Sequence, residues 1–304
     1  MGGAYVTLSL GNLGFLIRER VLGTETREIS LILTGDVMLG RTVMSHSLDQ
    51  VEDPIYPFRK VGEVLRAADL VFINLENPIV DGCPRHYGGF KFCADPAMVE
   101  GLTYAGVDVA NLANNHSLNY GQDGLVQTVG YLGSAGIAAT GLHPVRAVVI
   151  EEVSGVRFGF LGFELLSRKL KEEDLLLVRD SDGQVDVLVV GIHWGSEYTD
   201  RPSATQREWA QKLIDSGADV IAGHHPHWVQ PFDYAQGPGG EKKVIFWSLG
   251  NFVFDQMWSE RTRQGLAVKL TFKGKDLVGV EEMPIYMKNW AQPEFVVDRP
   301  RAGF

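Results

Sequence analysis

Five short apolar runs recur along this chain, and each ends in a polar residue of a type that enzymes use. The runs are SLILTGD, DLVFINLE, VDVANLANNH, VDVLVVGIHWG and ADVIAGHHPH. Their continuous Val, Ile, Leu and Phe content is typical of strands that are covered on both faces. Segments with helical spacing lie between the runs, so the sequence predicts an α/β fold in which helices cover the sheets.

Three segments carry apolar residues at helical spacing, namely 57–68, 121–136 and 205–219, and Gly217 is a candidate for the glycine that follows a helix end. Two other segments, 145–164 and 265–285, alternate like antiparallel hairpins, and the first is predicted to turn at Ser154–Gly155. The sheets are therefore expected to be mixed.

The two cysteines, Cys83 and Cys93, flank a segment that is read as a Gly-Gly hairpin, PRHYGGFKF. A disulfide and two free thiols are both compatible with this spacing, which is not that of a zinc ribbon.

The chain divides into an irregular N-terminal appendage, residues 1–28, and a single domain, residues 29–304. No apolar run approaches the ~18 residues that span a bilayer, so no integral membrane segment is predicted. The first residues are a poor signal peptide. The sequence as written indicates a cytoplasmic protein, or a membrane-associated or extracytoplasmic one if an anchor has been removed.

The formal charge of −10 argues against nucleic acid as a partner, because binding to phosphates needs clustered Lys and Arg. An anionic or peptide-like small molecule or polymer is the expected substrate.

The polar residues at the ends of the apolar runs are predicted to form one site, because open α/β sheets place their sites beyond the carboxyl ends of the strands. Carboxylate, amide and imidazole ligands together suit Zn, Mn or Fe, and their number fits two divalent metals. The residues are Asp36, Glu76, Asn115, His116, His193, His225 and His227.

Each of these residues could also have a structural role that involves no metal. Asp36 can cap a turn, Glu76 can be a strand-end charge and the Asn114–Asn115 pair can belong to a left-handed turn. His193 can be an ordinary hydrogen-bonded histidine. The shared position at strand ends is what favours a site.

The motifs LTGDVMLGR, NLENPI, LANNHSLNYGQDGL, GIHWGSEY, GHHPHWVQ and WSLGNFVFD resemble, in order, those of the CapA family. These are poly-γ-glutamate capsule-synthesis proteins of the calcineurin-like metallophosphoesterase superfamily. The resemblance covers about residues 29 to 260. It implies a four-layer α/β/β/α sandwich of mixed sheets with a two-metal site.

The resemblance also implies a role for each residue. Asp36 and His227 are expected to bind the first metal, and Glu76 to bridge both metals. Ligands of the second metal are expected to be Asn115, His193 and His225. His116 resembles the general acid. Asn251 is expected to line the site, and His224 to support the ligands or the fold.

The first motif departs from the superfamily pattern, which usually has Asp-x-His where this chain has Asp36-Val37-Met38. A thioether is a poor ligand for a hard metal, so the first site is expected to be weak. The longer side chain of Glu76, where the superfamily usually has Asp, would alter the spacing of the metals.

The leading hypothesis is a metal-dependent hydrolase of the CapA type, in which a metal-bound water attacks a phosphoester or an amide. His116 would protonate the leaving group, and Arg41 and Lys91 would hold an anionic substrate. One alternative is a non-hydrolytic factor in poly-γ-glutamate biosynthesis or export. Another is a metal-free acid–base enzyme on the same scaffold.

Overall fold

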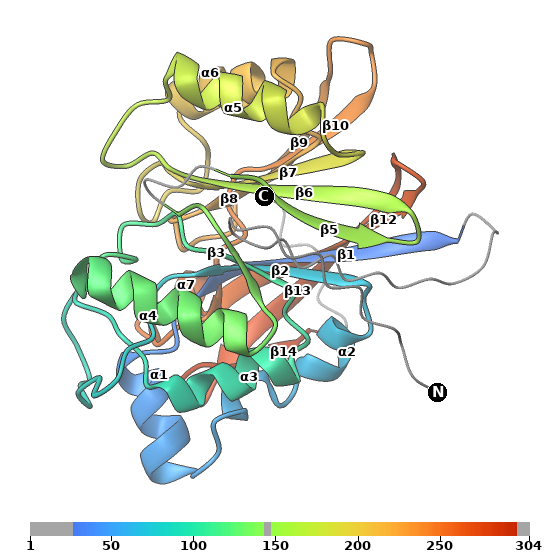
Figure 1. Ribbon diagram of the computed structural model, residues 1–304. Helices are drawn as coiled ribbons and strands as arrows, with labels where there is room; N and C mark the ends of the chain where they lie inside the picture. The colour runs from blue at the N-terminus through green and yellow to red at the C-terminus, as the bar shows by residue number, and fades with distance from the viewer. Residues whose placement is uncertain (1–26, 143–146, 297–304) are drawn as a thin grey trace, which may run out of the picture.

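Two β-sheets pack face to face, and helices cover both outer faces (Figure 1). The computed structural model describes residues 27–142 and 147–296. Helices α5 and α6 lie on one outer face, while α1, α2, α3 and α4 lie on the other. This arrangement confirms the predicted four-layer α/β/β/α sandwich of mixed sheets. The predicted appendage, residues 1–28, falls almost entirely outside the described residues, and a single domain over 29–304 stays a prediction.

The larger sheet has the strand order β14-β13-β12-β1-β2-β3-β4, and β11 pairs with the end of β1. Strands β1 to β4 and β11 are mutually parallel where they pair, whereas β12, β13 and β14 add an antiparallel edge. Its strands are β1 (Glu28–Val37), β2 (Leu70–Leu75), β3 (Val109–Asn111), β4 (Ala138–Thr140), β11 (Asn251–Val253), β12 (Gln264–Lys273), β13 (Asp276–Lys288) and β14 (Gln292–Phe295).

The smaller sheet has the order β5-β6-β7-β8-β10-β9, with parallel inner strands and an antiparallel strand at each edge. Its strands are β5 (Val149–Val153), β6 (Val156–Glu164), β7 (Val187–His193), β8 (Val220–His224), β9 (Phe232–Gln236) and β10 (Lys242–Phe246).

The helices are short except for the three that cover the parallel strands, α4, α5 and α6. The α-helices are α1 (Arg41–Ser45), α2 (Gly62–Arg66), α3 (Val99–Tyr104), α4 (Gly121–Ser134), α5 (Glu172–Asp182), α6 (Ala204–Asp215) and α7 (Glu260–Arg263). A π-helical turn (His46–Gln50) and 3₁₀ turns (Tyr56–Phe58, Pro96–Met98) accompany them. No helix in the described ranges combines the length and the apolar composition that a membrane crossing requires.

The continuous apolar runs are explained by the layers, because both faces of the inner strands are covered. In β7, Val187 and Val189 pack between the sheets, while Leu188 and Val190 pack beneath α5 and α6. In β1, Leu31 and its alternate neighbours likewise face the smaller sheet. Strands β1 and β7 thus each contribute to two of the three apolar clusters found among the described residues.

Two predicted turns are confirmed by their backbone angles. Ser154 and Gly155 have φ of 52° and 79° and join β5 to β6, as a two-residue hairpin turn requires. Gly217 has φ of 116° just past the end of α6, where a side chain would strain the backbone.

Three local predictions differ from the structure. Segment 84–92 is an irregular loop rather than a hairpin. The carbonyl oxygen of Gly89 accepts a hydrogen bond from Arg41 Nη1 at 2.9 Å and not from a neighbouring strand. Segment 57–68 is interrupted, since Pro57 lies in a 3₁₀ turn before α2. The strand predicted to reach Asn115 ends at Asn111, whose side-chain oxygen accepts from Ala113 N at 3.1 Å and turns the chain.

The register of both sheets brings polar strand ends to the same level. Asp36 lies opposite Asn74 on β2 and opposite Asn251 on β11. In the smaller sheet, His193 lies opposite His224. Gly35 is needed for this approach, because a Cβ there would lie 2.1 Å from the carbonyl oxygen of Gly250. The carboxyl ends of β1, β2, β7 and β8 therefore border one site.

Candidate metal centre

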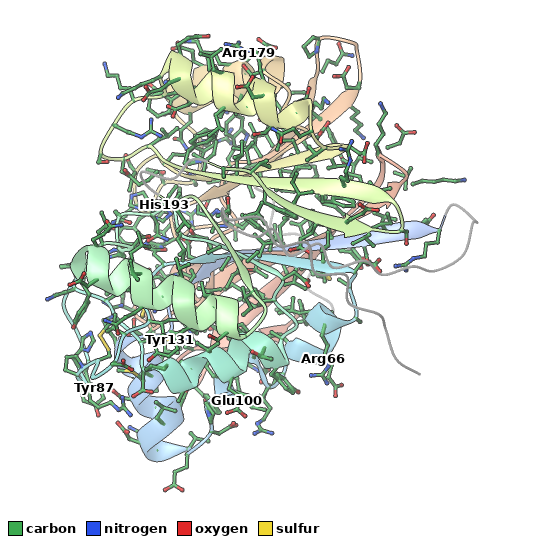
Figure 2. The ribbon with its side chains drawn as sticks, viewed as in Figure 1. Arg66, Tyr87, Glu100, Tyr131, Arg179 and His193 are labelled. Atoms are coloured by element: carbon green, nitrogen blue, oxygen red, sulfur yellow. A yellow bond between two sulfur atoms is a disulfide. The ribbon has the colours of Figure 1, made fainter. Side chains whose placement is uncertain are left out.

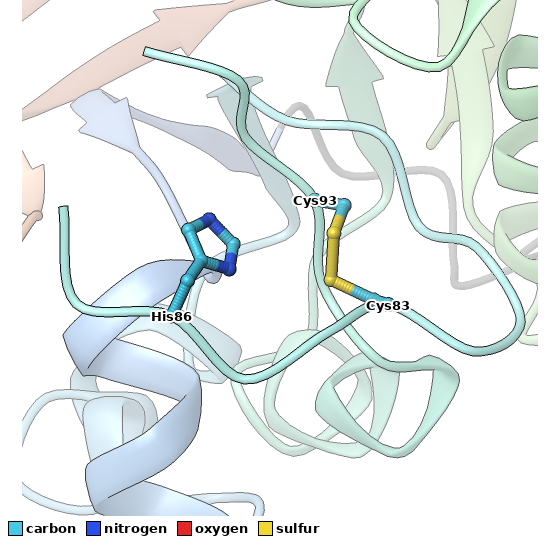
Figure 3. Close-up of side chains that lie close together, drawn as sticks. All are labelled: Cys83, His86 and Cys93. Carbon is cyan, nitrogen blue, oxygen red and sulfur yellow. A yellow bond between two sulfur atoms is a disulfide. The ribbon is translucent and has the colours of Figure 1, made fainter. Parts of the chain in front are cut away.

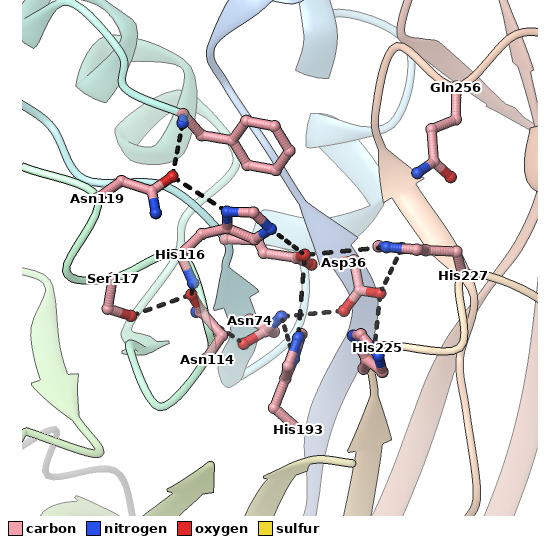
Figure 4. A network of polar contacts seen from close by, with 12 residues as sticks. Asp36, Asn74, Asn114, His116, Ser117, Asn119, His193, His225, His227 and Gln256 are labelled. Carbon is pink, nitrogen blue, oxygen red and sulfur yellow. Dashed lines mark hydrogen bonds and ion pairs between the residues drawn. The ribbon is translucent and has the colours of Figure 1, made fainter. Parts of the chain in front are cut away.

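Carboxylates from the larger sheet face imidazoles from the smaller sheet at this common edge. Asp36 lies at the end of β1, and Glu76 follows β2 directly. His193 ends β7, while His225 and His227 follow β8. Figure 4 shows the labelled rings of the three histidines directed toward Asp36 and its neighbours, and Figure 2 shows His193 between the two halves of the fold. All five side chains are buried.

The carboxylate of Glu76 is fully buried, and neither of its oxygens has a hydrogen-bond partner among the described residues. Its Oε1 lies 3.9 Å from the Nε2 atoms of three imidazoles, which is too far for hydrogen bonds. Burial, and then the negative charge of Asp36, raises the pKa of Glu76 well above its usual value. An isolated buried carboxylate is costly, so this position favours a cation. The imidazoles belong to His116, His193 and His227.

Asp36 is held differently, because polar groups surround its carboxylate. Asn74 Nδ2 donates to Oδ1 at 2.9 Å, and His225 N donates to Oδ2 at 3.3 Å. Nδ1 of His227 lies 3.2 Å from Oδ2. Burial alone would raise the pKa of Asp36, but the contact with His227 and the other partners hold it below its usual value. Asp36 is therefore ionised over the neutral pH range.

Asn251 orients the ring of His227 and sets its tautomer. Its Nδ2 faces the carbonyl oxygen of Thr262 at 2.9 Å, and a carbonyl can only accept. Its Oδ1 is therefore the atom 2.9 Å from His227 Nδ1, which must carry the proton. The lone pair of His227 Nε2 is left facing Glu76.

His116 is oriented in the same way by Asn119. Asn119 Oδ1 accepts from the backbone N–H of Phe92 at 2.6 Å, so it also accepts from His116 Nδ1 at 3.0 Å. The ring of His116 stacks on that of Phe92, with centroids 3.9 Å apart. Burial lowers the pKa of His116. Its Nε2 is thus the atom available toward Glu76.

His193 and His225 are neutral imidazoles with nitrogen atoms available for a ligand. Burial, and then the neighbouring His225, lowers the pKa of His193 well below its usual value. Burial lowers the pKa of His225 to about 4. His193 Nε2 and His225 Nδ1 are buried without a hydrogen-bond partner in the described part of the chain. Neutral imidazole with a free nitrogen is the form that binds metals.

The backbone that presents the last two histidines adopts unusual angles. His225 has φ of 96° and His227 has φ of 58°, in the left-handed region that costs non-glycine residues of the order of 1–3 kcal/mol. Such conformations persist where surrounding contacts hold them, and they cluster at functional sites. The turn aims two rings at the same space.

The adjacent asparagines predicted from the sequence are placed on opposite sides of their turn. Asn115, the expected ligand, is exposed. Asn114 is buried, and its Nδ2 donates to the carbonyl oxygen of Leu75 at 2.8 Å. Its Oδ1 accepts from the backbone N–H of His116 at 3.1 Å. Asn114 therefore supports the turn that carries His116.

The remaining predicted residues surround the centre. His224 is buried, with its Nε2 hydrogen-bonded to Thr34 O at 3.0 Å, so it ties the two sheets together. Arg41 forms an ion pair with Asp255, and its guanidinium lies 4.6 Å from the centroid of the Phe92 ring. Lys91 is exposed, with its ammonium 4.3 Å from the centroid of the Tyr120 ring.

Sequence reasoning missed Asn74, which donates to Asp36, and Asn119, which orients His116, and it missed Glu197. A ligand oxygen of Glu197 and ring nitrogens of His225 and His227 lie within 4.8 Å of one another. Glu197 is part of the quoted motif GIHWGSEY, four residues after His193. Its position so close to a strand-end histidine could have indicated that this acidic residue lies at the site.

The cysteines form a disulfide, which decides the question that their spacing left open. Cys83 and Cys93 are joined by an S–S bond, and His86 lies in the loop that it closes (Figure 3). Although these three residues are close enough to share an ion, sulfur in a disulfide is not a thiolate ligand. The disulfide holds the chain next to Phe92, which stacks on His116.

Known proteins resemble this chain along most of its length. A family model described as "Bacterial capsule synthesis protein PGA_cap" matches residues 30–256. The "Capsule biosynthesis protein CapA" of Bacillus anthracis is 33% identical over 288 residues, which cover 86% of this chain and 68% of the relative. The "PGA biosynthesis protein CapA" of Bacillus subtilis (strain 168) is 31% identical over 280 residues, 84% of this chain and 71% of the relative.

A solved structure is similar in fold. The crystal structure of a hypothetical protein from Thermus thermophilus matches with a TM-score of 0.53 and 16% identity, over 84% of this chain and 98% of that one. At this identity the likeness concerns the fold alone.

Proposed function

Because this chain belongs to the bacterial capsule synthesis protein family PGA_cap, we propose that it acts in capsule or poly-γ-glutamate metabolism as a metal-dependent hydrolase. The proposed reaction is hydrolysis of a phosphoester or an amide bond. The two named relatives are capsule or PGA biosynthesis proteins. The proposed hydrolysis would therefore be a step of capsule or poly-γ-glutamate biosynthesis.

The observation that carries the proposal is the environment of Glu76. A fully buried carboxylate without hydrogen bonds, surrounded at 3.9 Å by imidazole nitrogens, is unfavourable by itself. Bonds from nitrogen or oxygen to a divalent metal are about 2.0–2.2 Å long, so two ligands of one ion lie up to roughly 4 Å apart. The separations of these residues are too long for hydrogen bonds between them but suit ligands that share one divalent cation.

The proposed ligands of two divalent metals (Mn, Fe or Zn) are the buried carboxylates and the imidazoles with free nitrogens. They are Asp36, Glu76, His193, His225 and His227. Asn115, the other predicted ligand, would have to turn its exposed side chain toward them. Bound divalent ions would polarise the scissile bond and lower the pKa of a coordinated water toward ~7.

The chain's own residues would supply the proton for the leaving group. Nδ1–H of His116 is bonded to Asn119, so the doubly protonated ring would give its proton from Nε2 and become the neutral imidazole. Phe92 covers one face of the ring and restricts its rotation. A positioned general acid of this kind contributes typically 10²–10⁴-fold to the rate.

The proposed substrate is anionic or peptide-like, with part of it beside Asn114. A cavity of about 280 Å³ adjoins that residue and is lined by both apolar and polar groups. Arg168, on its wall, is paired with the buried carboxylate of Asp174 at 2.6 Å. Arg41 is likewise paired, whereas Lys91 is exposed and is the better candidate to attract an anion.

A second candidate function is a non-hydrolytic factor in assembly or export of the polymer. The names of the relatives favour it, since they state biosynthesis and no hydrolysis. In that case the metals would bind the acidic groups of a polymer without cleaving a bond.

The test measures metal content per chain by elemental analysis, on protein purified without chelator or added metal. The wild type is compared with His225→Ala, and His46→Ala is the matched control, since His46 lies outside the centre and contacts Gln50. We expect two metals in the wild type and in the control, and a loss in His225→Ala. Wild-type protein that binds no divalent metal after reconstitution would contradict the proposal.

A screen of phosphoester and amide substrates, with and without chelator, then distinguishes the two functions. Chelator-sensitive turnover supports the hydrolase, while a metal-bound protein that cleaves nothing but retains anionic polymer supports the assembly factor.

A further inference from the structure

Glu197 lies on the solvent side of the centre, next to two of the proposed ligands. One of its carboxylate oxygens and ring nitrogens of His225 and His227 lie within 4.8 Å of one another. The two rings are buried, with centroids 5.9 Å apart, whereas Glu197 is exposed. A hard oxygen ligand thus faces two imidazoles across a space of the size that one cation needs.

The loop that carries Glu197 is attached to the loop that carries the histidines. Backbone N–H of Tyr198 donates to the carbonyl oxygen of Pro226 at 2.9 Å. Gln230 Nε2 donates to the carbonyl oxygen of Thr199 at 2.9 Å. Tyr198 has φ of 59°, so the backbone beside Glu197 is held in a conformation that non-glycine residues rarely adopt. These contacts keep the carboxylate close to both rings.

The charge of Glu197 acts inside the centre. Burial is the main cause that raises the pKa of Glu76, and the negative charges of Asp36 and Glu197 add to it. No Lys or Arg forms an ion pair with Glu197 within residues 27–142 and 147–296. A cation between Glu197 and the imidazoles would offset this repulsion.

We propose that Glu197 is the third protein ligand of a divalent cation that His225 and His227 hold, an inference that rests on the function proposed above. Two histidines and one carboxylate form a ligand set that binds one Zn or Fe ion and leaves positions open for water or substrate. Asp36, Glu76 and His193 form the neighbouring group, which is fully buried.

This assignment changes the expectation drawn from Met38. Met38 is fully buried, and its sulfur lies 3.1 Å from the backbone nitrogen of Gly40, so it offers no imidazole-like ligand. Glu197 supplies an anionic oxygen ligand from a different strand end. The centre therefore contains three carboxylates against the four positive charges of two divalent ions, and one positive charge remains to attract an anionic substrate.

Mn²⁺ alone is the probe for the test, because it accepts nitrogen and oxygen ligands and its free form is measured directly by electron paramagnetic resonance. Metal-free full-length wild type, Glu197→Gln and Glu197→Asp are titrated. Glu100→Gln is the control, since Glu100 is an exposed acid on α3, far from His193 (Figure 2).

We expect two Mn²⁺ sites in the wild type and the control. In Glu197→Gln, one site should weaken by at least the roughly 10–100-fold that loss of a ligand's supporting partner costs, while the other site remains. Glu197→Asp should recover part of the lost affinity. All metal-free forms should melt at similar temperatures, because Glu197 is exposed and Gln has nearly the same shape.

Identical isotherms for the wild type and Glu197→Gln would overturn the assignment of Glu197 while leaving the metal-dependent function in place. Wild-type protein without any Mn²⁺ site would overturn both. The readout is metal affinity, so the result does not depend on finding a substrate.

Discussion

The two sheets contribute different chemistry to the same centre. The larger sheet supplies the two carboxylates proposed as ligands, Asp36 and Glu76, from strand ends that lie side by side. The smaller sheet and its loops supply imidazoles, of which His193, His225 and His227 approach the carboxylates. The oxygen side carries buried negative charge, and on the imidazole side burial lowers the pKa of His193 and of His225 and keeps both rings neutral.

This difference explains why neither sheet forms the centre alone. The rings of His193 and His225 cannot neutralise Glu76, because burial lowers their pKa values and so prevents them from taking up protons. A divalent cation satisfies both sides at once, because carboxylates supply charge and imidazoles supply neutral lone pairs. Metal binding should therefore also stabilise the contact between the two sheets.

The largest effect is expected from Glu76→Gln, which removes one of the two carboxylates of the oxygen side. Metal content should fall from two per chain to about one, because the site of Glu197, His225 and His227 keeps its own ligands, and hydrolysis should be lost. The metal-free variant should be more stable than the metal-free wild type at pH 8, because Glu76 has a raised pKa and ionises unfavourably when buried. Elemental analysis and chemical denaturation measure the two effects. Retention of both metals would show that Glu76 is not a ligand.

His116 and Glu197 are exceptions to the division, because His116 is an imidazole from the larger sheet and Glu197 is a carboxylate from the loop after β7 of the smaller sheet. His116→Ala should keep both metals but lower turnover by roughly 10²–10⁴-fold. Steady-state kinetics with a substrate found in the screen, together with metal analysis, test this. Asn119→Ala should show a smaller loss, since it removes only the hydrogen bond that orients the ring. Unchanged turnover in His116→Ala would remove it from the mechanism.

The imidazole side should make the stability of the metal-free protein depend on pH. Burial lowers the pKa of His225 to about 4, whereas the unfolded chain has the ordinary value near ~6.5. Between these values the unfolded state binds more protons, so stability rises with pH and levels off above about 6.5. The contribution of His225 is on the order of 3 kcal/mol.

Denaturant unfolding of chelator-treated protein between pH 4.5 and 7.5 measures this dependence. His225→Ala should flatten the rise, although His193 contributes in the same direction because its pKa is also lowered. Glu76 acts in the opposite direction, since a raised pKa in the folded state makes stability fall as pH rises above its unfolded value. Equal slopes in the wild type and His225→Ala would contradict the assignment.

The smallest effect on metal binding is expected from substitution of Asn251, which connects the larger sheet to His227. Asn251, on β11 of the larger sheet, orients His227 from the smaller sheet's loop. Asn251→Ala should weaken Mn²⁺ binding by about 10–100-fold without abolishing it. Asn251→Asp should retain part of the affinity, because one carboxylate oxygen still accepts from Nδ1–H while the other loses the hydrogen bond to the carbonyl oxygen of Thr262. Calorimetric titration of the metal-free proteins compares the three. An unchanged affinity in Asn251→Ala would show that Asp36 alone orients the ring.

Much of the fold could be predicted from local pattern. The continuous apolar strands, α4, α6 and the two hairpins follow from periodicity and turn residues, which act over a few positions. The loop at 84–92 could not, because Arg41 and the disulfide hold it through contacts distant in sequence. Similarly, Pro57 divided a segment whose apolar spacing alone favoured one helix.

The sequence by itself determined which ligand types stand at the strand ends, since the apolar runs stop at Asp36, Glu76 and His193. The tertiary structure decided which neighbouring polar residues face inward. His225 is directed to the centre by its positive φ, whereas His224 continues β8 and bonds to Thr34. Side-chain direction in a turn depends on backbone angles that distant contacts impose, so Glu197 joined the centre only when two loops were brought together.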